Sequence, residues 1–211
     1  MNLNNKFVIT INRELGSGGR TVGRKLAEKL GVAYYDKALI KALQERYNLS
    51  AEEIEKLKGQ EQSWWAEFKR KITFQDEEYN LIQTGIETED VFRAETEILK
   101  AIAQAESCVI AGRSAFYIFR EHPNHLSILI QASMLHRTAR VAREQHMSKE
   151  EARMVIDKVD RMRENYVNEY TGSSRYDTRN YQLVLSMDEL TEDAAVDIIL
   201  NYIKGMENGI S

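Results

Sequence analysis

The chain has 211 residues, a hydrophobic fraction of 43%, a charged fraction of 29% and a formal net charge of −4. These values are typical of an ordinary soluble globular domain and exclude a surface-wide basic footprint for nucleic acid. The single cysteine, Cys108, excludes an internal disulfide, and the histidines show no metal-ligand spacing. The N-terminal apolar run is too short for a signal peptide, and no stretch approaches membrane-spanning length. We therefore expect a cytoplasmic protein that binds neither nucleic acid nor membranes.

The N-terminal segment alternates between strand and helix patterns. Residues 7–12 are a β-branched and aromatic run that predicts a buried strand, and a glycine-rich turn follows at 16–19. Apolar residues then recur on one helical face over 20–30. Residues 32–35 predict a second strand, which ends at Asp36. A strand, a helix and a strand in this order predict a βαβ unit and a parallel sheet.

The rest of the chain continues this alternation after a long helical stretch. Residues 37–106 are nearly all helical in pattern, and 45–90 are expected to be a helical insertion. Trp64 and Trp65 within it favour an anchored helix or a subunit contact, so a homodimer is possible. Three further strands are expected at 108–111, 126–131 and 182–187, with helices between and after them. The predicted fold is α/β, a single domain over 1–211 with a three-layer open sheet of about five parallel strands and helices on both faces.

Residues 148–180 are expected to form a helix and a polar loop of their own. Ser148 and Glu151 are spaced as a capping box, which predicts the start of the helix. Within the helix a core-facing stripe is expected at Val155, Val159, Met162 and Tyr166.

The glycine-rich turn carries the clearest functional signal. A phosphate group needs converging backbone N–H groups, a helix N-terminus and a cation. A glycine-rich turn between a strand and a helix supplies the first two, which favours phosphate binding over a plain flexible turn. The residues concerned are Gly16, Ser17, Gly18, Gly19, Arg20 and Thr21.

The loop departs from the pattern G-x-x-x-x-G-K-[ST] because it contains no lysine. With Gly19 taken as the sixth position, Glu14 replaces the first glycine and Arg20 replaces the lysine. Arginine always carries charge and can bind phosphate oxygens bidentately. Arg20 is therefore the first candidate cation and Arg13 the second.

Several runs of sequence resemble the cytidylate kinase-like family. They include ITINRELGSGGRTVGRKLAEKLGVAYYDKALI, CVIAGRSAFYIF and LSILIQASMLHRTARVARE. The resemblance implies a P-loop nucleoside monophosphate kinase type of fold, with transfer of a phosphoryl group from ATP to CMP and use of Mg²⁺. It also implies that 45–90 lie on the acceptor side and that 148–180 form a lid.

The resemblance further implies roles for individual residues. Aligned on G-S-G-K-G-T, the lysine position is Gly19, and Thr21 helps to position Mg²⁺. Asp36 matches an acidic residue at the monophosphate site. Gly112-Arg113 matches the Gly-Arg of D-G-R-D, whose aspartates are replaced by Ala111 and Ser114. The acceptor-site candidates are Asp36, Arg93, Arg113 and Ser114.

Phosphoryl transfer needs several cations around the transferring group. Arg137 and Arg140 follow the fourth expected strand and are candidates for binding ATP. Arg161 and Arg163 on the lid helix, with Arg20, are the candidate catalytic cations, and Asp160 is expected to orient an arginine. The missing lysine and aspartates leave two alternatives open: a non-catalytic nucleotide-binding or regulatory module, and a kinase with a non-nucleotide acceptor.

Overall fold

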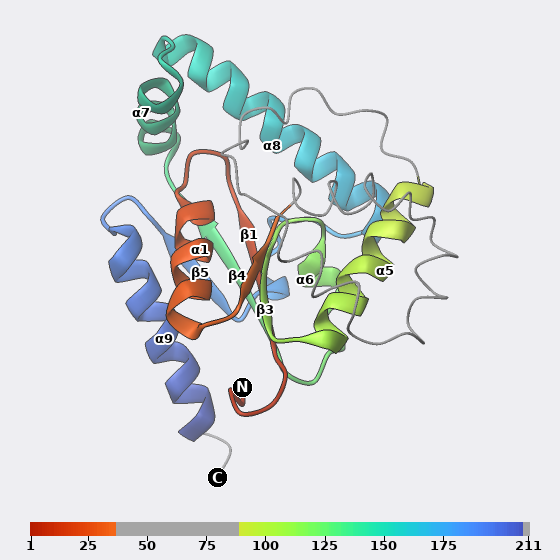
Figure 1. Ribbon diagram of the computed structural model, residues 1–211. Coiled ribbons are helices and arrows are strands. Elements are labelled where there is room, and N and C mark those ends of the chain that lie inside the picture. Colours follow the sequence, from red (N-terminus) through yellow and green to blue (C-terminus); the bar gives the residue numbers. More distant parts are fainter. Residues whose placement is uncertain (37–88, 209–211) are drawn as a thin grey trace, which may run out of the picture.

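The computed structural model describes residues 1–36 and 89–208, and its central feature is a parallel sheet (Figure 1). Within these ranges five strands pair in the order β2-β3-β1-β4-β5, and every pairing is parallel. The predicted α/β class with five parallel strands is therefore confirmed. The strands are β1 (Val8–Arg13), β2 (Ala33–Tyr35), β3 (Cys108–Ala111), β4 (His125–Gln131) and β5 (Leu183–Ser186).

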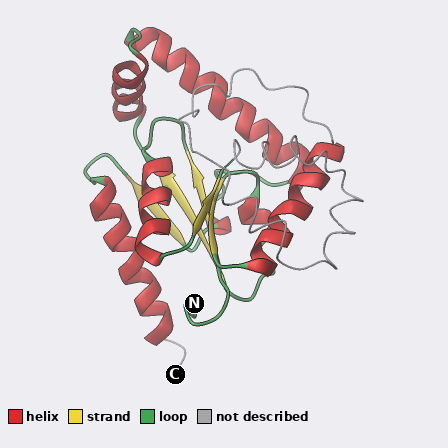
Figure 2. Cartoon of the chain, viewed as in Figure 1, coloured by secondary structure: helices red, strands yellow, loops and turns green. Residues whose placement is uncertain are grey.

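Helices cover both faces of the sheet and one of its ends. Figure 2 shows the strands enclosed between helices, and in Figure 1 α1 and α9 lie on one face while α5 and α6 lie on the other. The helices α7 and α8 lie beyond the end of the sheet where β1 leads into the loop before α1 (Figure 1). Their bounds are α1 (Gly19–Leu30), α5 (Glu89–Ala105), α6 (Ala115–Ile118), α7 (Met134–Gln145), α8 (Lys149–Thr171) and α9 (Glu192–Asn208), with a 3-10 turn at Thr178–Asn180.

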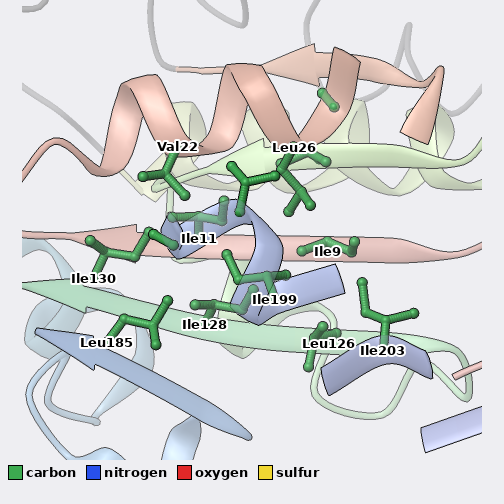
Figure 3. Close-up of a cluster of buried hydrophobic side chains, with 14 of the residues drawn as sticks. Ile9, Ile11, Val22, Leu26, Leu126, Ile128, Ile130, Leu185, Ile199 and Ile203 are labelled. Carbon is green, nitrogen blue, oxygen red and sulfur yellow. The ribbon is translucent and has the colours of Figure 1, made fainter. Parts of the chain in front are cut away.

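The central strand β1 is buried along its whole length, which explains its β-branched and apolar sequence. Alternate residues of a strand point to opposite faces. Ile9 and Ile11 accordingly pack with Leu26 and Ile199 in the core beneath α1 and α9 (Figure 3). Val8 packs in the opposite core, against residues of α5 and α6. The loop after β1 therefore emerges between two buried cores.

The helix α8 begins as predicted but buries a different stripe. Ser148 and Glu151 form the capping box at its start. Ala152, Ile156 and Val159 are buried against α7, whereas Met162 is 36% exposed, so the predicted stripe is wrong at Met162. The reason is that the first half of α8 packs on α7 and its second half borders a cavity.

Three other sequence expectations need comment. The helix predicted after β3 is only one turn, Ala115–Ile118. The expected insertion at 45–90, with Trp64 and Trp65, lies outside the described residues except for its last two positions, which begin α5. Among the residues that are described, no helix has the length and apolar character needed to cross a membrane.

Candidate active site

The loop between β1 and α1 has the backbone of a tight turn at a helix N-terminus. Gly16 and Gly18 have φ angles of 79° and 82°, in the left-handed region that glycine adopts most easily. Gly18 caps α1, which begins at Gly19. The hydroxyl of Ser17 donates to the carbonyl of Glu14 at 2.9 Å and so closes the turn from inside. Backbone N–H groups at such a helix start favour a bound anion.

Arg20 and Asp36 form an ion pair across the start of this helix. The Arg20 Nη2 atom lies 3.2 Å from Asp36 Oδ2, and both side chains are almost completely buried. Two residues predicted for the site are thus brought together from α1 and from the end of β2. Thr21, in the same turn of α1, is partly exposed.

A buried ionic network supports the loop from the side of α7 and α8. Asp160 Oδ2 lies 2.5 Å from Arg137 Nη1, and the same arginine atom donates to the carbonyl of Leu15 at 3.4 Å. Asp160 Oδ1 accepts from the N–H of Leu15 at 3.1 Å. The carboxylate of Asp160 also lies 3.8 Å from Arg163 and 3.6 Å from Arg175. Of the two lid-helix arginines that Asp160 is expected to orient, Arg163 lies near its carboxylate, whereas Arg161 is exposed.

Two further charged side chains hold the loop in place. Arg140 lies against Gly18, where an added Cβ would come within 2.7 Å of Nη1, and it pairs with Glu192 at 2.7 Å. Glu14 accepts from the N–H of Ala132 at 3.1 Å. Burial raises the pKa of the Glu14 carboxyl, opposed by that N–H and by the charge of Arg137. Arg137 and Arg140 thus have structural partners in the protein itself.

A cavity of about 330 Å³ opens beside the loop, between the carboxyl ends of β1 and β3 and the helix α8. Ligands of open parallel sheets bind at this edge. Its wall combines a cluster of arginines with aromatic rings, a composition suited to a planar anion. The arginines are Arg13, Arg113, Arg163 and Arg175, and the aromatic residues are Phe116, Tyr166 and Tyr170.

Arg113 reaches the cavity from an unusual turn. Gly112, Arg113 and Ser114 all have positive φ angles, of 80°, 55° and 54°. Left-handed backbone at the two non-glycine residues costs about 1–2 kcal/mol each, and such strain clusters at functional sites. Arg113 forms an ion pair with Glu95 of α5, and Tyr166 donates to Glu95 at 2.9 Å. The guanidinium of Arg113 also lies 5.0 Å from the centre of the Tyr166 ring.

The other cavity arginines surround the backbone at the end of β1. The carbonyl of Arg13 accepts from Arg163 at 3.2 Å and also from Arg175. Arg13 is 6% exposed and Arg175 only 1%. One carboxylate, Asp160, is shared between Arg163 and Arg175. The inner wall of the cavity is therefore basic.

Two predicted residues lie apart from this wall. Arg93 is exposed on α5 and pairs with Asp90 of its own helix, and Arg161 is exposed on α8.

Sequence reasoning missed Glu95 and Arg175. Glu95 did carry a signal, since it precedes Ile98 and Leu99 by three and four residues and so falls on the apolar face of α5. Arg175 stands in a polar loop without periodicity, and no local pattern distinguishes it from a surface arginine.

The strand order and the glycine loop after the central strand define a P-loop kinase type of α/β fold. An uncharacterized protein from Eubacterium ventriosum has a similar structure, with a TM-score of 0.71 and 26% identity, covering 94% of this chain and 98% of that one. Shikimate kinase from Bacteroides thetaiotaomicron shares the fold, with a TM-score of 0.52, 16% identity and coverage of 94% and 98%. Shikimate kinase from Acinetobacter baumannii has a TM-score of 0.52, 15% identity and coverage of 99% and 98%.

Residues 8–189 match the cytidylate kinase-like family, and the chain belongs to that family. It is also similar to the cytidylate kinase of Sulfolobus acidocaldarius, with 25% identity over 206 residues that cover 96% of this chain and 98% of the relative. The family resemblance that the sequence motifs suggest is confirmed.

Proposed function

We propose that the protein is a kinase that transfers the γ-phosphoryl group of ATP to a nucleoside monophosphate, namely CMP. The observation that carries the proposal is the basic, aromatic-lined cavity beside the glycine loop. Its volume of about 330 Å³ lies within the range of about 300–1,000 Å³ typical of small-molecule sites. Family membership and the similarity to a cytidylate kinase support the same assignment.

The chemistry follows from the placement of the cations. An oxygen of the acceptor phosphate attacks the γ-phosphorus, the new P–O bond forms, and the bond to the bridging oxygen breaks as ADP leaves with the electron pair. The protein forms no covalent bond and contributes positioning and positive charge. Arg113 and Arg163 would face the acceptor phosphate and the transferring group, and the backbone N–H groups at Gly18 and Gly19 would hold ATP.

Mg²⁺ would enter with the nucleotide. Within the described residues no cluster of three or more His, Cys, Asp or Glu side chains forms a metal cage. Mg²⁺ keeps several waters and binds largely through substrate phosphates, so one protein oxygen beside the loop fits it. The hydroxyl of Thr21 in the first turn of α1 would supply that oxygen, and the ion would neutralise phosphate charge.

The remaining candidates take supporting places in this proposal. Asp36, paired with Arg20, would border the acceptor side, and Ser114 would offer its buried hydroxyl from the strained turn. Arg137 and Arg140 would act on ATP through the shape of the loop that they hold. We leave Arg93 and Arg161 out of the site because both are exposed.

The test is release of ADP from Mg·ATP in the presence of CMP, other nucleoside monophosphates and non-nucleotide acceptors. We expect turnover with CMP. Replacing Arg113 by Met should raise the KM for CMP about tenfold or more, the scale of a lost charge-assisted hydrogen bond, and leave the KM for ATP within about twofold. Arg143→Met, an exposed arginine of α7, is the control and should change neither.

Two outcomes would contradict the proposal. Binding of ATP without transfer to any acceptor would favour the regulatory module. Turnover with non-nucleotide acceptors alone would overturn the assignment of CMP.

A further inference from the structure

The side chain of Arg13 occupies the space that a phosphate-loop lysine would need. A Cβ added to Gly19 would lie 2.6 Å from the Cβ of Arg13 and 3.2 Å from its Cγ. The first distance is far inside van der Waals contact, so the two positions cannot both carry a side chain without a shift of backbone. The glycine at position 19 and the arginine at position 13 therefore depend on each other, because only one of the two positions can carry a side chain.

The spacing of the loop gives this arrangement a simple description. Gly16, Ser17 and Gly18 followed by Thr21 align with G-S-G-K-G-T, which places the lysine at Gly19. In the pattern G-x-x-x-x-G-K the first glycine stands six positions before the lysine, and that position is Arg13. The standard loop would have glycine at position 13 and lysine at position 19, whereas this chain has arginine at 13 and glycine at 19. The two residues lie in contact with each other.

The guanidinium of Arg13 extends from the loop to the cavity. Its Cβ and Cγ lie beside the first residue of α1, whereas its Nη1 lies against Gly112, where an added Cβ would collide with it. Arg13 also lines the cavity between β1, β3 and α8. Its charge therefore lies between the glycine loop and the basic cavity.

The charge of Arg13 is available to a ligand. Arg13 is 6% exposed, and among the described residues no acceptor takes a hydrogen bond from its Nε and no carboxylate lies within 4.0 Å of its guanidinium. A buried charge without a counter-charge is costly, and an anion bound in the site would offset that cost. Arg20 differs in this respect, because it pairs with Asp36.

We propose that Arg13 performs the task of the missing lysine by binding the terminal phosphates of ATP, in a phosphate loop whose cation and glycine have exchanged positions. The inference rests on the proposed function in one respect, since it takes ATP as the ligand. It assigns to position 13 a role that the alignment of the loop alone gives to position 19 or 20.

Calorimetric titration of the 211-residue chain with Mg·ATP tests the exchange. Arg13→Met keeps an unbranched apolar stem beside Gly19 and removes the guanidinium charge, and it should weaken binding about tenfold or more. Gly19→Lys alone should weaken binding to a similar degree, because the new side chain collides with Arg13. The double variant Arg13→Gly with Gly19→Lys restores the standard pattern and should bind within about threefold of the wild type. Arg143→Met is the control for the loss of one positive charge.

Clear results would overturn the inference. Binding by Arg13→Met within about threefold of the wild type would do so, as would a double variant no tighter than its single variants. Thermal unfolding of each protein checks that it is folded. Should the double variant fail to fold, Arg13→Lys decides: it keeps the charge and must bind more tightly than Arg13→Met.

The failure of this inference is distinguishable from failure of the proposed function. Binding that depends on Arg13, without transfer to any acceptor, would overturn the function and leave the inference standing. Transfer to CMP that is indifferent to Arg13→Met would do the reverse. A wild-type protein that binds no Mg·ATP would overturn both.

Discussion

Asp160 on α8 and Arg137 on α7 hold the backbone of the glycine loop between them. Their side chains are 2.5 Å apart and almost completely buried. The carboxylate of Asp160 accepts from the N–H of Leu15, and Arg137 donates to the carbonyl of the same residue. The peptide groups on both sides of Leu15 are therefore fixed by an ion pair that belongs to two other elements. The loop is therefore held by this pair as well as by the turns at its glycines.

Replacing Asp160 by Asn should destabilise the protein strongly. The substitution leaves Arg137, Arg163 and Arg175 without the carboxylate that they share, and breaking a buried ion pair by removing one partner costs about 3–5 kcal/mol. Urea unfolding should show a loss of that size. Asp157→Asn is the matched control, because Asp157 is exposed on the same helix and should change stability by less than about 0.5 kcal/mol. Equal effects of the two variants would contradict this account.

Gly16 should tolerate alanine less well than Gly31 does. Both residues have positive φ angles, 79° and 66°, so a side chain at either position costs about 1–2 kcal/mol in backbone strain. At Gly16 the new Cβ would also lie 2.9 Å from the carbonyl oxygen of Arg137 and 2.9 Å from Val141, whereas at Gly31 nothing described lies within 4 Å. We expect Gly16→Ala to lose more stability than Gly31→Ala by about 1–3 kcal/mol, the cost of overpacking, as measured by urea unfolding.

The affinity for Mg·ATP should also differ between Gly16→Ala and Gly31→Ala. Gly16→Ala should also lose affinity for Mg·ATP, because the collision displaces the loop, while Gly31→Ala, at the far end of α1, should keep the wild-type affinity. If Gly16→Ala and Gly31→Ala lost the same stability and the same affinity for Mg·ATP, the loop would not be tightly packed against α7.

His125 should make stability fall in mild acid. It lies at the start of β4, beside the hydroxyl of Thr10 at 2.7 Å. Burial lowers the pKa of the His125 imidazole from 6.5 to about 4, with a smaller contribution from His122. Below pH 6.5 the unfolded chain therefore takes up a proton that the folded protein does not accept until about pH 4. The contribution of His125 to the free energy of unfolding is therefore complete above pH 6.5 and is lost progressively as the pH falls toward 4.

The measurement is the free energy of unfolding at pH 7 and at pH 5 for the wild type and for His125→Gln. The wild type should lose about 2 kcal/mol more than the variant between these two values, since each unit of pKa difference corresponds to about 1.4 kcal/mol. Parallel losses in the two proteins would show that His125 titrates normally in the folded state.

The elements of the fold could be predicted from local patterns in the sequence. Three such features depend only on neighbours a few residues away. They are the β-branched run of β1, the glycine that caps the end of α1, Gly31, and the capping box of Ser148 and Glu151. Such features are visible in a sequence because their causes are local. The predicted stripe on α8 failed at Met162 because burial there is decided by what α8 packs against, which no period within the helix encodes.

The site could be predicted only in part, for the same reason. Arg113 and Arg163 were found by resemblance and line the cavity, but the ion pair of Arg113 with Glu95 joins positions in separate elements. Arg13 and Gly19 are close in sequence, but they come into contact only because the chain turns between them. Neither residue type alone indicates that contact. Arg175 has no local signal at all and is placed by the loop that follows α8.

The carbonyl of Arg13 accepts hydrogen bonds from both Arg163 and Arg175, which come from α8 and from the segment after it. The loop is therefore not a portable sequence. Grafting residues 13–21 into another kinase would transfer the glycines and the arginine but leave behind the donors that orient the chain. An engineer who wished to move this loop would have to transplant α8 and its following segment together with it.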